Sequence, residues 1–152
     1  MDGLFKIPSQ LLDDIQKGND FELEGHIFDK SFTSGISSSQ ITCVTEDKNG
    51  VIWVGTNGGL NKYISEEDNF EHYFVQDGLP SNYVTGVVVD DSNGLWISSK
   101  KGISFFDQND TTFTNYSLTD GIGNIDFHRH SYDQSSDGYI FFGGPMGITK
   151  VM

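Results

Sequence analysis

The sequence has few cysteines, few basic residues and no long apolar run, and each shortage narrows what the protein can be. Its 152 residues include a single cysteine, Cys43, so no intrachain disulfide can form and the cysteine count does not select a compartment. We expect Cys43 to be a small buried residue. The start of the chain lacks an apolar run long enough for a signal peptide, and no stretch predicts a membrane span. We therefore expect either a cytoplasmic protein or a piece of a longer exported chain.

Basic residues are outnumbered by acidic ones. Nine Lys and Arg stand against 22 Asp and Glu, which gives a formal net charge of −13. Such a surface repels the phosphate backbone, so we expect no nucleic acid partner. Acidic glycans would be repelled as well, unless Lys and Arg side chains meet them locally.

Glycine and aromatic residues are plentiful, and they recur at a fixed spacing. The stretch from Gly35 to Tyr73 returns as Gly78 to Tyr116, so that Trp53 reappears 43 residues later as Trp96. A repeat of this length built from short β-strands is typical of β-propeller blades. The predicted fold is all-β, a partial propeller of about three blades, each a four-stranded antiparallel meander.

Each full unit contains four predicted strands. In the first unit they are Ile41–Glu46, Val51–Gly55, Leu60–Ile64 and Phe70–Val75. In the second they are Val84–Val89, Leu95–Ser99, Ile103–Phe106 and Phe113–Leu118. Asn49-Gly50 supplies the positive φ of a tight hairpin turn between the first two strands. Because one thin sheet cannot bury both faces, we expect the repeated tryptophans to pack between blades rather than to serve as sugar platforms.

The repeat also predicts the organisation of the whole chain. Residues 34–76 and 77–119 form blades, residues 1–33 form a half blade with an insertion at 8–19 that contains one helical turn, and residues 120–152 form an incomplete blade. The strands expected in the incomplete blade are Phe127–Tyr132, Tyr139–Gly143 and Gly147–Val151. About three blades cannot close a ring of four to eight. We therefore expect the open faces to meet the remaining blades of a larger propeller or another copy of the chain.

The motif D-x-x-G-x-I-W-V-G-T-x-x-G-L at Asp47–Leu60, followed by D-G-L-P-S-N at Asp77–Asn82, resembles the two-component regulator propeller repeat. The second unit departs from the pattern at Ser98, where the first has Gly55, and at Lys101, which replaces a glycine. The third copy is degenerate. The resemblance nevertheless covers nearly the whole chain.

This resemblance implies a function. Propellers of the family form the periplasmic sensor part of membrane-bound hybrid histidine kinases, and many respond to oligosaccharides. It therefore implies a non-enzymatic, periplasmic ligand-binding fragment that passes a signal to a kinase elsewhere in the parent chain. It implies no cofactor, and a membrane link only through parts of the parent that this sequence lacks.

The candidate site lies in the loops between blades and between second and third strands, because these loops surround the channel mouth of a propeller. The candidate ligand-binding residues in these loops are Asn57, Asn82, Tyr83, Lys100, Lys101 and Asn124. His128 and Arg129, in the segment Ile125–His130, are further candidates for a ligand contact near the channel. Asp126, His128 and His130 would share one face of a strand and could bind zinc, but alternating polar residues also describe a strand with one wet face. We therefore predict no metal site and no catalytic residue.

Two other readings remain open. The propeller could serve dimerisation and signal transmission without a small ligand. A propeller lyase or hydrolase is less favoured, but it stays open because the chain has many carboxylates whose geometry the sequence does not show.

Overall fold

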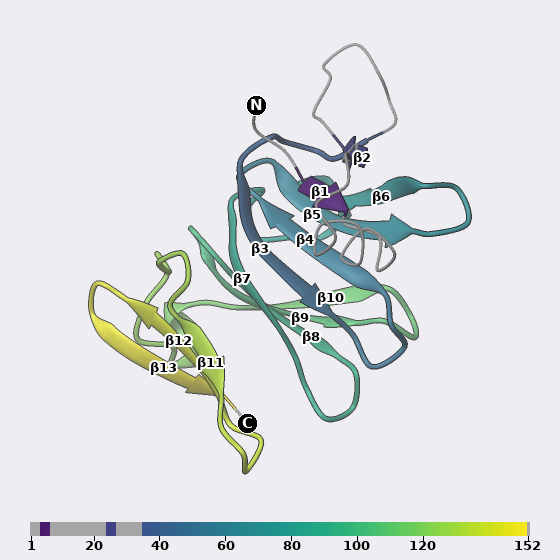
Figure 1. Cartoon of the computed structure of the whole chain (residues 1–152). Helices are drawn as coiled ribbons and strands as arrows, with labels where there is room; N and C mark the ends of the chain where they lie inside the picture. The colour runs from purple at the N-terminus through teal and green to yellow at the C-terminus, as the bar shows by residue number, and fades with distance from the viewer. Residues whose placement is uncertain (1–3, 7–23, 27–34, 152) are drawn as a thin grey trace, which may run out of the picture.

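The computed structural model describes residues 4–6, 24–26 and 35–151, and they form an all-β structure of four antiparallel sheets (Figure 1). The sheets follow one another along the chain, as expected of propeller blades. The strands of the first full blade are β3 (Ile41–Glu46), β4 (Ile52–Thr56), β5 (Gly59–Ile64) and β6 (Asn69–Tyr73). Those of the second are β7 (Val84–Val89), β8 (Leu95–Ser99), β9 (Gly102–Asp107) and β10 (Thr112–Tyr116).

Both full blades are meanders in which each strand pairs with the next one along the chain. The predicted four-strand pattern is thus confirmed. The two sheets share a local irregularity, because the register shifts between Ile41 and Cys43 in β3 and between Val84 and Gly86 in β7. The irregularity recurs 43 residues apart, so the repeat is kept in backbone detail as well as in sequence.

Two predicted fourth strands end earlier than expected. Val75 and Leu118 do not extend the strands but begin short 3-10 turns, η1 (Val75–Asp77) and η2 (Leu118–Asp120). The carboxylate of Asp77 accepts the backbone N–H of Phe74 at 2.8 Å, and Asp120 accepts that of Ser117 at the same distance. Each strand ends here because the carboxylate binds the backbone amide at the point where the chain turns away from the sheet.

Each turn is followed by a glycine with positive φ. Gly78 has a φ of 120° and Gly121 a φ of 90°, and Gly35 lies at 114° in the equivalent place before the first blade. Residues other than glycine rarely adopt these φ values. The repeated pairs Asp77-Gly78 and Asp120-Gly121 therefore turn the chain from one blade to the next.

The last sheet contains β11 (Tyr132–Gln134), β12 (Ile140–Gly144) and β13 (Gly147–Val151). The prediction of a first strand at Phe127–Tyr132 is wrong, because β11 begins only at Tyr132. Phe127 is buried and lies at the repeat position of Val84, 43 residues earlier. Tyr132 pairs with Phe142 as Val87 pairs with Ile97 in the second blade, but Tyr132 stands two residues later in its repeat than Val87 does. The extra length forms a loop in which His130 has a φ of 57°.

At the other end of the described chain, β1 (Leu4–Lys6) pairs with β2 (Glu24–His26) in antiparallel register. This pair lies within residues 1–33, where the sequence predicts a half blade. The predicted helical turn in the insertion at 8–19 lies outside the described residues.

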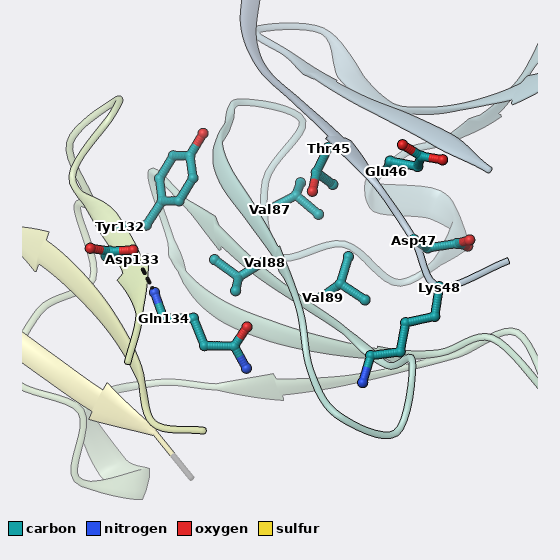
Figure 2. Close-up of a pocket in the computed structure, with 10 residues that line it drawn as sticks. All are labelled: Thr45, Glu46, Asp47, Lys48, Val87, Val88, Val89, Tyr132, Asp133 and Gln134. Carbon is teal, nitrogen blue, oxygen red and sulfur yellow. Dashed lines mark hydrogen bonds between the residues drawn. The ribbon is translucent and has the colours of Figure 1, made fainter. Parts of the chain in front are cut away.

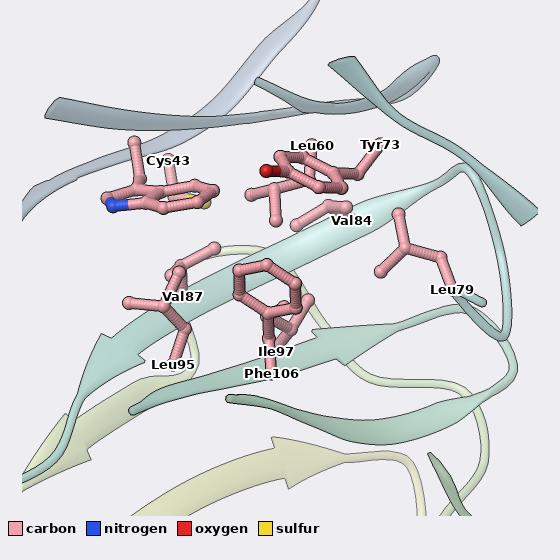
Figure 3. Packing of buried hydrophobic residues seen from close by; sticks show 10 residues of the cluster. Cys43, Leu60, Tyr73, Leu79, Val84, Val87, Leu95, Ile97 and Phe106 are labelled. Carbon is pink, nitrogen blue, oxygen red and sulfur yellow. The ribbon is translucent and has the colours of Figure 1, made fainter. Parts of the chain in front are cut away.

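The core lies between the blades. One cluster joins Trp53, Leu60 and Tyr73 of the first blade to buried side chains of the second, and Figure 3 shows side chains of both blades meeting in one layer. The members contributed by the second blade and its leading loop are Leu79, Val84, Val87, Leu95, Ile97 and Phe106. A second cluster joins Val88 and Ile103 to Phe127, Ile140 and Phe142 of the last blade, with Trp96 packed against it. The expected position of both tryptophans is therefore confirmed.

Each tryptophan is held by an acid at the hairpin six residues earlier. The indole N–H of Trp53 donates to Asp47 at 3.0 Å, and that of Trp96 donates to Asp90 at 3.2 Å. Burial alone would raise the pKa of the Asp47 carboxyl, but hydrogen bonds from the Trp53 indole and the amides of Val51 and Asn49 lower this pKa below its ordinary value. The ionised carboxylate therefore couples the hairpin turn to the inter-blade core.

Within the described residues, no helix is long and apolar enough to cross a lipid bilayer.

Candidate functional site

The loops between second and third strands lie beside the segments that lead into the blades. In the first blade the amide of Asn57 donates to the carbonyl of Gln40 at 3.2 Å. In the second blade the amide of Lys100 donates to the carbonyl of Tyr83, also at 3.2 Å. The two blades therefore hold these loops with the same backbone hydrogen bond, and the side chains can differ.

In the first blade this place is filled by neutral side chains. Asn57 accepts a hydrogen bond from the Ser38 hydroxyl and donates to the Gln40 side chain at 2.6 Å. Asn57 is thus engaged with its own blade.

In the second blade the same place carries charge. The ammonium of Lys100 lies 2.5 Å from a carboxylate oxygen of Asp126 and 5.8 Å from the centre of the Tyr83 ring. The guanidinium of Arg129 lies 5.4 Å from the centre of the same ring. Two cations from different loops therefore converge on one aromatic side chain, an arrangement that cation–π attraction favours.

The backbone positions this cluster. The β8–β9 hairpin is hydrogen-bonded to the next inter-blade segment at two points. The amide of Phe127 donates to the carbonyl of Ser99 at 3.1 Å, and the amide of Gly102 donates to the carbonyl of Ile125 at 2.7 Å. Asp126 lies between these two anchors and so faces Lys100, the residue after Ser99. The bonds belong to a loop and not to a strand, which is why the geometry could not be predicted from strand alternation.

The other candidate residues have separate surroundings. Asn82 is exposed and accepts the amide of Val75 at 2.8 Å, and Lys101 is exposed beside Lys100. Asn124 is buried, and its side chain is bonded to the turn between β12 and β13. It accepts a hydrogen bond from the amide of Met146 at 2.8 Å and donates one to the carbonyl of Gly147 at 3.1 Å. His128 is exposed, and its amide donates to the carbonyl of Gly143 at 3.0 Å.

The proposed strand face of Asp126, His128 and His130 does not exist, because these residues lie in the loop before β11. Among the residues that the structure describes, no three His, Cys, Asp or Glu side chains are grouped to hold a metal ion.

A cleft that the sequence did not indicate runs along the first strands of the three blades (Figure 2). It has a volume of about 430 Å³, and Val87, Val88 and Val89 of β7 lie between residues of β3 and β11. Carboxylates of Glu46 and Asp133 lie on its two sides. No candidate residue from the sequence lines this cleft.

The buried thiol of Cys43 belongs to β3, one of these first strands, and is not a reactive group. Burial raises the pKa of Cys43 to about 11, so the thiol stays protonated at neutral pH. Burial also raises the pKa of Tyr132, whose ring fills the space beside Gly86. The expectation that Cys43 is a small buried core residue is confirmed.

The stacked four-stranded meanders define the protein as a β-propeller structure. Residues 35–58 and 78–101 match the family described as two component regulator propeller. The chain therefore carries two copies of the two component regulator propeller repeat, and the resemblance noted in the sequence is confirmed for both units. No curated protein sequence matches the chain.

Solved structures agree on the fold. The extracellular domain assigned to the hybrid two component system BT3049 of B. thetaiotaomicron is 21% identical, with a TM-score of 0.73 over 85% of this chain and 17% of that one. Virginiamycin B lyase of Staphylococcus aureus is 14% identical, with a TM-score of 0.56 over 86% of this chain and 45% of the lyase. The chain thus spans less than half the length of either protein, and at these identities the likeness concerns the fold alone.

Proposed function

We propose that this chain is part of the extracytoplasmic sensor of a two-component system and binds an oligosaccharide at the loop face of its blades. The observation that carries the proposal is the pair of two component regulator propeller repeats at residues 35–58 and 78–101. The fold shared with the extracellular domain of BT3049 supports it. The kinase that receives the signal belongs to a different part of the parent chain, so this region has no catalytic role and needs no cofactor.

The cluster of Tyr83, Lys100 and Arg129 supports a ligand site at this face. Binding sites on repeat scaffolds form where loops from successive units meet, and this cluster joins the loops of two blades. Side chains that the repeat does not require are free to be selected for a ligand. In the proposed parent, the site faces the periplasm.

Calorimetric titration of the complete parent ectodomain with a panel of oligosaccharides tests this function. The sensor proposal predicts saturable heat with at least one member and weaker binding when Lys100 and Lys101 are replaced by Ala. The absence of heat with every member would favour a propeller that serves dimerisation alone. Turnover of a labelled glycan would instead establish a lyase or hydrolase.

We also propose that a fourth strand completes the last sheet and that a further blade of the same kind covers it. Ile148 corresponds in the repeat to Leu60, which the second blade covers completely, whereas 74% of Ile148 is exposed. The hydroxyl of Thr149 is buried without a hydrogen-bond partner in the described part of the chain, whereas the equivalent Ser104 bonds to β10 at Asn115, 2.7 Å away. A fourth strand beside β13 and a sheet over Ile148 would satisfy both features.

Sedimentation of the chain alone tests this second proposal. With the further blade missing, the open face should drive association that increases with concentration, and Ile148→Asp should weaken it. Val44→Asp, at an exposed position of the first blade, is the matched control. A chain that stays monomeric at high concentration, or that associates equally well with Ile148→Asp, would contradict the proposal.

A further inference from the structure

We propose that the cluster of Tyr83, Lys100 and Arg129 binds the anionic group of an acidic saccharide, a carboxylate or a sulfate ester. This inference rests on the proposed sensor function and specifies the chemical class of its ligand. It depends on how charge is distributed over the described residues.

The cations of the described chain have different surroundings, and Lys150, for example, lies 3.3 Å from the centre of the Tyr139 ring. Lys48 lies 3.3 Å from a carboxylate oxygen of Asp91, and Lys62 lies 3.9 Å from one of Glu71. At the loop face, by contrast, Lys100 and Arg129 both lie near the Tyr83 ring, and the carboxylate of Asp126 pairs with Lys100. In a protein of net charge −13, this is a local excess of positive charge.

Two of these cations share one aromatic ring. Lys100 and Arg129 both lie within 6 Å of the Tyr83 ring centre, although like charges repel one another. Within the described part of the chain, Arg129 has no carboxylate at ion-pair distance. Its planar guanidinium can offer two parallel N–H donors, which match a carboxylate or a sulfate. A bound anion would pair with Arg129 and offset the positive charge of both cations.

The fold itself does not require these charges. The equivalent place in the first blade has the same backbone hydrogen bond, yet it contains Ser38, Gln40 and Asn57, which are neutral and bond to one another. The cationic character of the second blade is therefore not a condition of blade packing. It is a property of this one site.

The overall charge limits the kind of anion. A long polyanion would extend past the cluster and meet the acidic remainder of the surface, where repulsion acts over about 10 Å at moderate salt. A short saccharide with one or two acidic groups needs only the local cations. Because the Tyr83 ring already holds two cations, we assign it the role of positioning them and not of stacking on a sugar.

Titration of the ¹⁵N-labelled chain with matched probes tests the inference. The probes are trigalacturonate with its fully methyl-esterified form, and N-acetylglucosamine 6-sulfate with N-acetylglucosamine, at low and at moderate salt. We expect the amides of Lys100 and Arg129 to shift with at least one acidic probe, and the neutral counterpart to bind at least about tenfold more weakly. The probe that binds distinguishes a carboxylate from a sulfate ligand.

Three variants make the test specific. Arg129→Gln should weaken binding of the acidic probe about tenfold, and Asp126→Asn should strengthen it because a competing carboxylate is removed. Lys62→Gln, at a cation outside the cluster, should leave the affinity unchanged.

Two results would overturn the inference. The first is equal binding of acidic and neutral probes, or binding of neither acidic probe. The second is acidic binding that ignores both Arg129→Gln and Asp126→Asn. If neutral oligosaccharides bind at the loop face as tightly as acidic ones, this inference fails and the sensor proposal still stands.

Discussion

Small and large residues exchange places between the two full blades. In the first blade Cys43 of β3 pairs with Gly55 of β4, and in the second Gly86 of β7 pairs with Ser98 of β8. A Cβ on Gly55 would lie 2.5 Å from the Cys43 sulfur, and one on Gly86 would lie 2.3 Å from the Tyr132 ring. The departure of Ser98 from the repeat pattern is therefore compensated across the strand pair.

This exchange predicts a coupling between two positions. Gly55→Ser should lower the free energy of unfolding by about 1–3 kcal/mol, because the new side chain overlaps with Cys43. Adding Cys43→Gly should recover part of the loss, so the double variant should be more stable than the two single effects predict. Urea unfolding of the three variants measures this coupling. Strictly additive effects would show that the two side chains do not share one space.

The bond between Asp47 and Trp53 predicts a pH dependence of stability. The folded-state pKa of Asp47 is lowered, so its contribution is fully present above the unfolded pKa of about 3.9 and is lost as the pH falls through the folded value. Asp47→Asn should therefore cost about 1–3 kcal/mol at pH 7 and progressively less below about pH 4. Urea unfolding at pH 7 and pH 3 measures this difference.

Glu66→Gln is the matched control for this charge change, because Glu66 is exposed in the turn between β5 and β6. Its effect should be small at both pH values. A loss for Asp47→Asn that is equal at pH 7 and pH 3 would show that the ionised carboxylate is not what holds the indole.

At the scale of elements, the two tryptophans report on different interfaces. Trp53 is 1% exposed, and the centre of its ring lies 5.7 Å from that of Phe106 in the next blade, whereas Trp96 is only half-buried. We expect Trp53→Phe to cost about 1–2 kcal/mol more than Trp96→Phe. Because the blades share their cores, each single-tryptophan variant should show a fluorescence transition that coincides with its circular dichroism transition. Separate transitions would mean that the blades unfold independently.

The elements that the sequence predicted well are those that the repeat determines. β3, β7, β8 and β13 have the predicted bounds, because alternation and turn residues recur there in register. The strand predicted at Phe127–Tyr132 failed because the third unit has extra residues between its buried Phe127 and its first ladder pair. The 43-residue spacing does not reveal where an insertion lies once the motif becomes degenerate.

The candidate site was predictable only in part for a related reason. Tyr83 and Lys100 were selected because they lie in loops of one face, and Arg129 because it lies in the segment Ile125–His130; the structure brings the three together. Asn124 lies in the same kind of loop, but its amide is bonded to the turn at Met146. Loop position follows from the repeat, whereas the partners of a side chain depend on backbone hydrogen bonds between blades.

At the scale of the whole molecule, stability comes from contacts between sheets. Each of the two inter-blade clusters takes its members from neighbouring blades, and the first blade alone would expose Trp53, Leu60 and Tyr73 to water. A single four-stranded sheet of this size buries too little apolar surface to offset the conformational entropy of folding.

The most direct measurement is therefore the folding of residues 35–76 alone, followed by circular dichroism and proton NMR during heating, beside the complete chain. We predict that the isolated blade has no dispersed spectrum and no cooperative transition, whereas the complete chain unfolds cooperatively. A sharp, reversible unfolding transition of the isolated blade would contradict the claim that these sheets depend on one another.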